Sequence, residues 1–192
     1  MTDVELHFDG PYTFTPGERS LFHAPCAQAT GVYLWTFRQD VDGAHLIHYV
    51  GETLSFAKRH REHLIHVLSM NYGLFEPEKA QQGVSEILWP GLWRRRSADG
   101  PAECLAAYAT LNEAVRRYLD ALCVFFAPTS VETNLRKHIE GCVGWNLRMW
   151  HPVHKVLYPD DNHIGTNRDK THGVLRITSS EMIRGLDPEI PY

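Results

Sequence analysis

Two short β-rich segments lie close together in the first third of the chain. Residues 31–37 and 44–50 are dominated by apolar, β-branched and aromatic side chains, and the stretch between them is polar. Two such segments separated by a short polar connection are typical of a β-hairpin. We therefore expect two antiparallel strands here, with the turn at Asp40–Gly43.

Farther along the chain, the apolar positions follow the spacing of a helix. Ser55 is a residue type that caps helices, and apolar side chains recur at helical spacing after it. This pattern predicts a helix from about 56 to 69. Residues 101–120 are rich in Ala, Leu, Glu and Arg and begin with a proline, which predicts a second helix.

A strand and a third helix are expected next. Residues 122–126 form a continuous apolar run that ends at Pro128, which predicts a strand buried on both faces. A helix should run from 129 to about 140, where Gly141 breaks it, and a further strand should occupy 174–177.

Proline and glycine divide the chain into a central domain and its flanks. We expect an irregular lead-in at 1–28 and a domain at 29–150 with an insertion at about 70–120. A C-terminal extension at 151–192 should pack on the same domain and finish in a helical turn and a loose terminus.

The composition is that of a globular protein, with 192 residues, 43% hydrophobic and 22% charged. No run approaches the roughly 20 apolar residues that span a bilayer, and the first residues lack the layout of a signal peptide. The sequence therefore predicts a cytoplasmic protein with no membrane partner. The four cysteines contain no C-x-x-C pair, which favours free thiols.

The formal net charge of −4 argues against a uniformly basic surface, but basic side chains cluster locally. Because screening limits phosphate contacts to a Debye length of about 10 Å, local clusters matter more than total charge. Each cluster taken alone is also typical of an ordinary solvated face. The candidates for nucleic-acid contacts are Lys58, Arg61, Arg94, Arg95, Arg96 and Lys137.

Two tyrosine motifs bracket the expected hairpin. Gly31-Val32-Tyr33 opens the first strand and Tyr49-Val50-Gly51 closes the second, so antiparallel pairing brings both tyrosines to one end or one face. Arg59 and His63 follow on the expected helix, where positions four apart share a face. A lone tyrosine in a strand is more commonly a half-buried structural residue. The flanking glycines and the arginine together favour a functional site.

This order of motifs resembles the GIY-YIG nuclease superfamily, in which a hairpin with both motifs leads into a helix that carries an essential arginine. The similarity covers about residues 29–70 and 121–147. It implies a mixed α/β (α+β) domain with a small, mainly antiparallel sheet of three or more strands flanked by helices. It also implies a metal-dependent endonuclease that hydrolyses phosphodiester bonds in DNA, with RNA not excluded.

The resemblance further implies a metal-binding glutamate at the start of a later helix and an asparagine a dozen or so residues beyond it. Glu132 occupies the glutamate position. Asn146 matches the asparagine, and Asn162 and Asn167 are alternatives farther downstream. A structural interpretation competes at Glu132, because Thr129-x-x-Glu132 has the spacing of a helix capping box.

These residue types suit phosphodiester hydrolysis. Arg59 can bind phosphate with two parallel hydrogen bonds, and Glu132 can hold Mg²⁺ or Mn²⁺, because Mg²⁺ takes only one or two protein carboxylates. The family assigns one tyrosine as the base and the other as an orienting group, and we favour Tyr33 as the base and Tyr49 as its partner. An unperturbed tyrosine has a pKa of about 10, so nearby cations must lower it. His63 is expected to assist Arg59 at the phosphate or the base.

Two alternatives remain open. His60, His63 and His66 repeat every three residues, but such steps rotate around a helix and converge poorly on zinc, so we expect His60 and His66 at the surface or in a groove. The second alternative is a module of the same fold that binds nucleic acid without cutting it.

Overall fold

The computed structural model describes residues 3–94, 99–150 and 173–192. The predicted hairpin forms from β2 (Gly31–Arg38) and β3 (His45–Thr53), which pair antiparallel along their whole length. Gly43 closes the turn with a φ of 72°, a left-handed conformation that favours glycine. β6 (Leu122–Pro128) pairs antiparallel with the other edge of β2 and is buried as predicted.

The sheet is larger than expected and mixed. It has seven strands in the order β8-β3-β2-β6-β1-β7-β9. β1 (Val4–Thr13) lies inside it, antiparallel to β6 and parallel to β7 (Val174–Ser179). The lead-in expected at 1–28 thus contains a central strand. The sequence allows a short strand within the lead-in, but β1 is ten residues long, because its alternation of buried and less buried positions continues through Pro11.

The C-terminal segment also contributes strands. β7 was predicted, but the helical turn expected after it is wrong, because β8 (Ile183–Arg184) and β9 (Glu189–Pro191) form instead. β8 pairs parallel with the start of β3, and β9 pairs antiparallel with β7. These strands are two and three residues long, too short to leave a periodic signal.

The helices depart from the predictions in length. α1 (Phe56–Leu68) is confirmed. The helix expected at 101–120 is two helices, α3 (Gly100–Ala106) and α4 (Tyr108–Ala121). α5 (Thr133–Trp150) starts later than expected and continues through Gly141, so the predicted break is wrong. A glycine costs about 1 kcal/mol in a helix, which the packing of an apolar helix face offsets.

The insertion expected at about 70–120 has structure of its own before α3. A two-stranded sheet of β4 (Leu74–Phe75) and β5 (Ile87–Trp89) flanks α2 (Pro77–Gln81). None of the helices within the described ranges has the length and apolar character needed to cross a bilayer.

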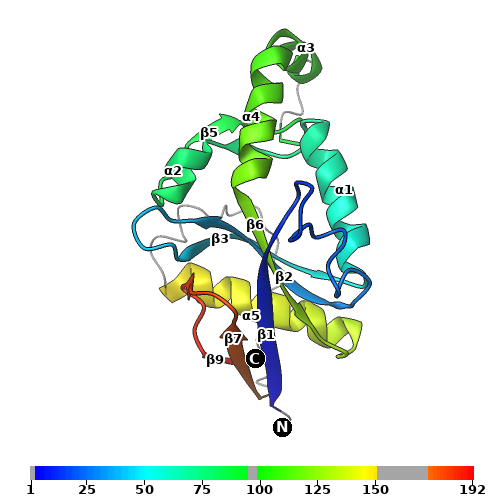
Figure 1. The fold of residues 1–192 in the computed structure, drawn as a ribbon, viewed down its shortest axis with the longest axis vertical. Coiled ribbons are helices and arrows are strands. Elements are labelled where there is room, and N and C mark those ends of the chain that lie inside the picture. The colour runs from blue at the N-terminus through cyan, green and yellow to red at the C-terminus, as the bar shows by residue number, and fades with distance from the viewer. Residues whose placement is uncertain (1–2, 95–98, 151–172) are drawn as a thin grey trace.

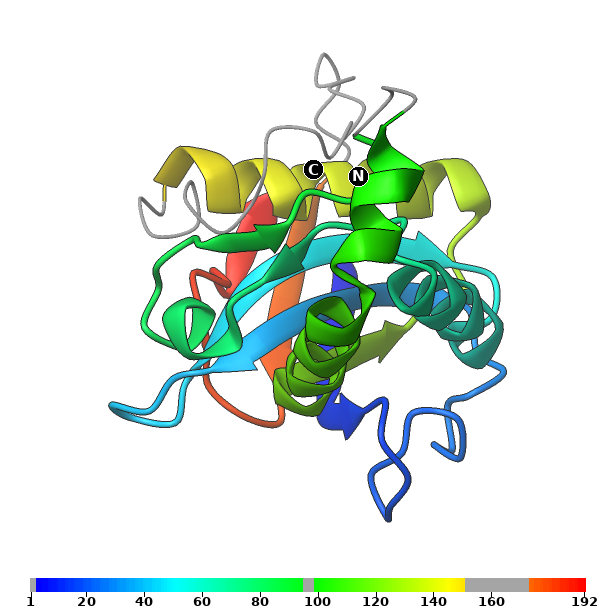
Figure 2. The ribbon, with the colours of Figure 1, turned by 90° about the horizontal axis from the view of Figure 1, so that it is seen from above.

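Helices cover both faces of the large sheet. α1 and α4 lie above it and α5 lies below it (Figure 1), and the view from above shows α5 crossing the strands (Figure 2). Side chains of β2 alternate between the two cores: Tyr33 and Trp35 join the cluster on the α1 side, and Val32 and Leu34 join the cluster that includes α5. The two tyrosine motifs therefore lie in the middle of the molecule.

A buried ion pair joins α5 to the end of β3. The Arg136 side chain is 1% exposed, and its Nε donates to Glu52 Oε2 at 2.7 Å. Its two terminal nitrogens donate to the carbonyl of Val131 and the hydroxyl of Thr133. Arg136 directly precedes Lys137, a candidate nucleic-acid contact, but its own charge is paired inside the fold.

Replacing Arg136 by methionine should therefore destabilise the protein strongly. The change leaves the Glu52 carboxylate partly buried without its cation, and the loss of one partner of a buried pair costs about 3 kcal/mol or more. Chemical denaturation followed by circular dichroism measures the change. Arg116→Met is the matched control, because Arg116 forms ion pairs only at the exposed surface of α4. A loss of stability equal to that of the control would contradict this role for the pair.

Candidate active site

Tyr33 and Tyr49 lie side by side on the α1 face of the sheet. Their ring centroids are 6.0 Å apart, and Tyr33 is fully buried whereas Tyr49 is partly exposed. The Tyr33 ring passes directly over Gly51, where a Cβ atom would lie 2.3 Å from its hydroxyl. The glycine of the second motif is therefore required by the tyrosine of the first.

α1 adds Arg59 and His63 to the two tyrosines. The Tyr33 hydroxyl and His63 Nε2 are 2.7 Å apart, and His63 Nδ1 lies 2.9 Å from the Tyr72 hydroxyl. Since a neutral imidazole has one donor and one acceptor nitrogen, His63 connects the two hydroxyls in one chain. The guanidinium of Arg59 lies close enough to Tyr33 and Tyr49 for its charge to lower the pKa of both phenols, and it pairs with Glu62 at 3.2 Å. The four residues expected from the hairpin and the first helix thus form one cluster.

Burial controls the protonation of this cluster. It raises the pKa of Tyr33 well above its ordinary value and raises that of Tyr49, and the positive charge of Arg59 only partly opposes both shifts. Burial and then the Arg59 charge lower the pKa of His63 to about 2. Both phenols and the imidazole are therefore neutral at neutral pH, so the prediction that cations would lower a tyrosine pKa is not met in the protein alone.

Glu140 is the acidic residue whose charge reaches the cluster. It lies on α5, and its charge raises the pKa of both Tyr33 and Tyr49. Burial first, and the negative charge of Glu52 next, raise the pKa of Glu140 itself to about 7, and Arg59 opposes this shift. The charge of Glu140 therefore acts on the tyrosines and on Arg59 from α5, which packs on the other face of the sheet.

The sequence interpretation missed Glu140. Its signal was present: Arg136 and Glu140 are one helical turn apart, so a helix tied to Glu52 through Arg136 also presents Glu140 near that strand end. Because the helix was expected to end near residue 140, the expected elements offered no reason to place the Glu140 side chain at the site.

Glu132 lies apart from the cluster of Tyr33, Tyr49, Arg59 and His63. It is exposed just before α5, in a shallow depression that also includes Thr30 and Leu54. Eight residues separate it from Glu140, about 12 Å along a helix axis. The capping-box alternative is wrong as well, because the Thr129 backbone N–H donates to the carbonyl of Thr30.

Asn146 does not join the tyrosines. It lies on α5, whose buried face packs on the opposite side of the sheet. Asn146 is 9% exposed, and its Oδ1 has no hydrogen-bond partner in the part of the chain that the structure describes. Asn162 and Asn167 lie outside the described residues.

The buried histidines of α1 form hydrogen bonds with other groups of the protein. His60 is fully buried, contrary to the surface position expected, because its Nδ1 bonds the Phe56 carbonyl and its Nε2 accepts from the Trp35 indole. Within residues 3–94, 99–150 and 173–192, no three His, Cys, Asp or Glu side chains are grouped to hold a metal. Both ring nitrogens of His63 are also hydrogen bonded, to Tyr33 and Tyr72.

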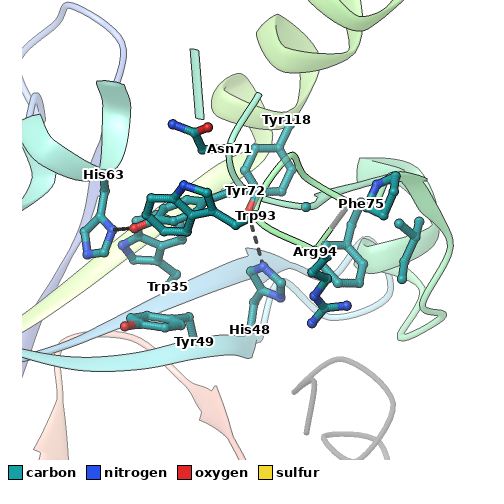
Figure 3. A pocket seen from close by; sticks show the side chains of 13 residues that line it. Trp35, His48, Tyr49, His63, Asn71, Tyr72, Phe75, Trp93, Arg94 and Tyr118 are labelled. Atoms are coloured by element: carbon teal, nitrogen blue, oxygen red, sulfur yellow. Dashed lines mark hydrogen bonds between the residues drawn. The ribbon is translucent and has the colours of Figure 1, made fainter. Parts of the chain in front are cut away.

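A cavity of about 470 Å³ opens beside the cluster. Tyr49 and His63 form part of its wall, and the segment at 71–94 supplies much of the remainder (Figure 3). The insertion thus builds a pocket next to the tyrosines rather than extending away from them. The pocket is lined by Trp35, His48, Tyr49, His63, Asn71, Tyr72, Gly73, Phe75, Ile87, Pro90, Trp93, Arg94 and Tyr118.

The candidate nucleic-acid contacts are distributed over several elements of the fold. Lys58 and Arg61 are exposed on α1, and Lys137 is exposed on α5. Arg94 is exposed at the cavity, while Arg95 and Arg96 lie outside the described residues.

Comparison with known proteins gives no relative: neither a family model, nor a curated protein, nor a solved structure matches the chain.

The buried histidines predict acid sensitivity of the fold. His60 and His63 have pKa values lowered to about 3 and about 2, chiefly by burial. An unfolded histidine has a pKa of about 6.5, so below that pH the unfolded state binds protons that the folded state does not. The free energy of unfolding should fall by about 1.4 kcal/mol per histidine between pH 7.5 and pH 5.5.

Urea denaturation at the two pH values measures this dependence. His60→Gln should remove about half of the histidine contribution, and His23→Gln, at an exposed position, should leave the dependence unchanged. An unaltered pH dependence in His60→Gln would contradict the buried neutral state of His60.

Proposed function

We propose that this protein is a GIY-YIG-type endonuclease that hydrolyses phosphodiester bonds of nucleic acid with the help of a divalent cation. The observation that carries the proposal is the convergence of Tyr33, Tyr49, Arg59 and His63 in one cluster, in which Tyr33 is hydrogen bonded to His63, Tyr49 packs against both rings, and the Arg59 charge acts on both phenols. These four residues come from two strands and a helix, and a merely structural hairpin does not require a partly exposed arginine against two phenols.

Arg59 binds the phosphate in this proposal. Its side chain is 39% exposed and pairs with the exposed Glu62 at 3.2 Å, an ion pair that a phosphate oxygen would replace. A guanidinium remains charged throughout the accessible pH range and matches the geometry of phosphate oxygens. It stabilises the negative charge that grows on the phosphoryl oxygens during attack.

The hydroxyl chain removes the proton of the attacking water. The water oxygen bonds to phosphorus, one phosphorus–oxygen bond breaks, and the leaving oxygen takes a proton from solvent. Tyr49 borders the cavity, whereas Tyr33 is buried behind it next to His63. The water proton passes to the Tyr49 oxygen, the Tyr49 hydroxyl proton moves to the Tyr33 oxygen, and the Tyr33 hydroxyl proton moves to His63 Nε2. A bound phosphate adds negative charge near His63, which raises its pKa and makes it a better acceptor.

Glu140 is the candidate ligand of a divalent cation. Burial and the Glu52 charge raise its pKa to about 7, and a cation bound at Glu140 would stabilise the ionised carboxylate. When bound, Mg²⁺ or Mn²⁺ neutralises charge on a phosphoryl oxygen, and it needs only one or two protein carboxylates. We therefore assign the cation to Glu140, with Glu52 nearby, in preference to Glu132.

Cleavage of supercoiled plasmid in the presence of Mg²⁺ tests the proposal. Arg59→Ala should lower the rate by about 10² to 10³-fold, as for the loss of one preorganised charge partner. Glu140→Gln should abolish Mg²⁺-dependent cleavage, and Glu132→Gln, the same chemical change just before α5, should retain it. Loss of activity in Glu132→Gln alone would return the cation to the position expected from sequence.

A wild-type protein that binds nucleic acid in a salt-sensitive way but never cuts it would establish the binding module instead. Absence of both cutting and binding, for plasmid and for branched or single-stranded oligonucleotides, would reject a nucleic-acid function on those substrates.

The cleavage rate should also depend on pH. The Glu140 carboxyl has to lose its proton to bind a cation, and its pKa is about 7, so the rate should rise as pH increases through 7 and level off above it. Single-turnover rates from pH 5.5 to pH 8.5 measure this profile. Glu132→Gln should keep the profile, and a rate that is constant across pH 7 would contradict the role of Glu140.

A further inference from the structure

The cavity beside the tyrosines has walls of flat aromatic rings. Trp35 and Tyr49 come from the sheet, and Tyr72 and Trp93 come from the insertion on the other side (Figure 3). The ring centroids of Trp35 and Tyr49 are 5.5 Å apart, and those of Tyr72 and Trp93 are 5.1 Å apart. Aromatic walls of this kind stack on planar ligands.

Polar groups are placed among these rings. His48 and Asn71 line the cavity, and the Arg94 guanidinium lies at its exposed rim. A pocket with aromatic walls and a few polar groups can fix both the plane and the edge of a heterocyclic ligand. Its volume of about 470 Å³ falls in the range of roughly 300–1,000 Å³ typical of small-ligand sites.

The cavity is continuous with the candidate active site. Tyr49 and His63 belong to both, and the Tyr72 hydroxyl that accepts or donates to His63 is also part of the wall. A nucleic-acid strand with one phosphate at Arg59 therefore carries its neighbouring base to this pocket. Aromatic side chains bind bases of single strands by stacking, and they also receive bases that are extruded from a duplex.

We propose that the cavity between the sheet and the insertion holds one unstacked nucleobase of the substrate strand. The substrate is then a single-stranded segment, or a duplex from which one base is extruded at a mismatch or a branch. The proposal rests on the proposed nuclease function for its substrate, but its test measures binding alone. Trp93 is the probe residue, because it is 55% exposed and packs only against the rings of His66 and Tyr72 among the described ring contacts.

The test uses a fluorescein-labelled ten-nucleotide DNA strand in EDTA, so that no cleavage occurs, with affinity measured by fluorescence anisotropy. Trp93→Ala should bind the strand about tenfold more weakly than the wild type, because loss of one stacking partner has about that effect. Trp93→Phe should restore most of the affinity. Tyr108→Ala removes an equally exposed aromatic ring on α4, outside the cavity, and should bind as the wild type does.

Abasic strands identify the contact as a base contact. Moving a single abasic unit along the strand should reveal one position at which the wild type loses about tenfold in affinity. An abasic unit at the same position should leave the affinity of Trp93→Ala almost unchanged, since the two changes remove the same interaction. Equal affinity for all abasic strands, or an equal abasic loss in both proteins, would overturn the proposal.

Binding to duplex DNA distinguishes a base of a single strand from a base extruded from a duplex. Tighter binding of a duplex with a central mismatch than of the matched duplex, lost in Trp93→Ala, supports extrusion, because a mismatched base costs less to flip. Binding of the single strand alone supports a single-stranded substrate. Wild-type protein that binds neither DNA overturns the proposal.

The two proposals fail separately. Base-dependent binding without Mg²⁺-dependent cleavage keeps the pocket and rejects the nuclease. Cleavage that is indifferent to Trp93 and to the abasic unit keeps the nuclease and rejects the pocket.

Discussion

The buried ion pair between Arg136 and Glu52 holds the two parts of the candidate site together. Glu52 follows the second tyrosine motif on β3, and Arg136 lies one turn before Glu140 on α5. The pair therefore sets the position of a carboxyl on one side of the sheet relative to tyrosines on the other. A charge of this kind is expensive to bury, and it is retained here because three hydrogen bonds satisfy the guanidinium.

The sequence predicted the elements that are determined by neighbouring residues in the chain. The hairpin followed from alternating β-formers and a glycine turn, and α1 followed from its capping residue and periodicity. These two elements contain Tyr33, Tyr49, Arg59 and His63, so most of the site could be predicted before its structure was known. The physical reason is that strand pairing and helix pitch fix which side chains share a face.

Long-range packing decided what the sequence could not predict. β1 is a central strand because distant β6 and β7 pair with it, and α5 continues through Gly141 because its apolar face is buried on the sheet. The charge of Glu140 on this helix, rather than that of Glu132 before it, acts on the tyrosines. Local glycine and proline rules mark breaks, but tertiary contacts of a few kcal/mol override them. The protonation of the cluster likewise depends on burial, which no local pattern reveals.

A crystal structure with Mn²⁺ and a short phosphorothioate strand that resists cleavage, with the metal located by its anomalous scattering, would test the proposed site directly. We expect a manganese peak at Glu140, a phosphate group against Arg59, and the Tyr49 hydroxyl facing that phosphate. A strand bound elsewhere on the surface, with the cluster of Tyr33, Arg59 and His63 closed and free of phosphate, would contradict this expectation.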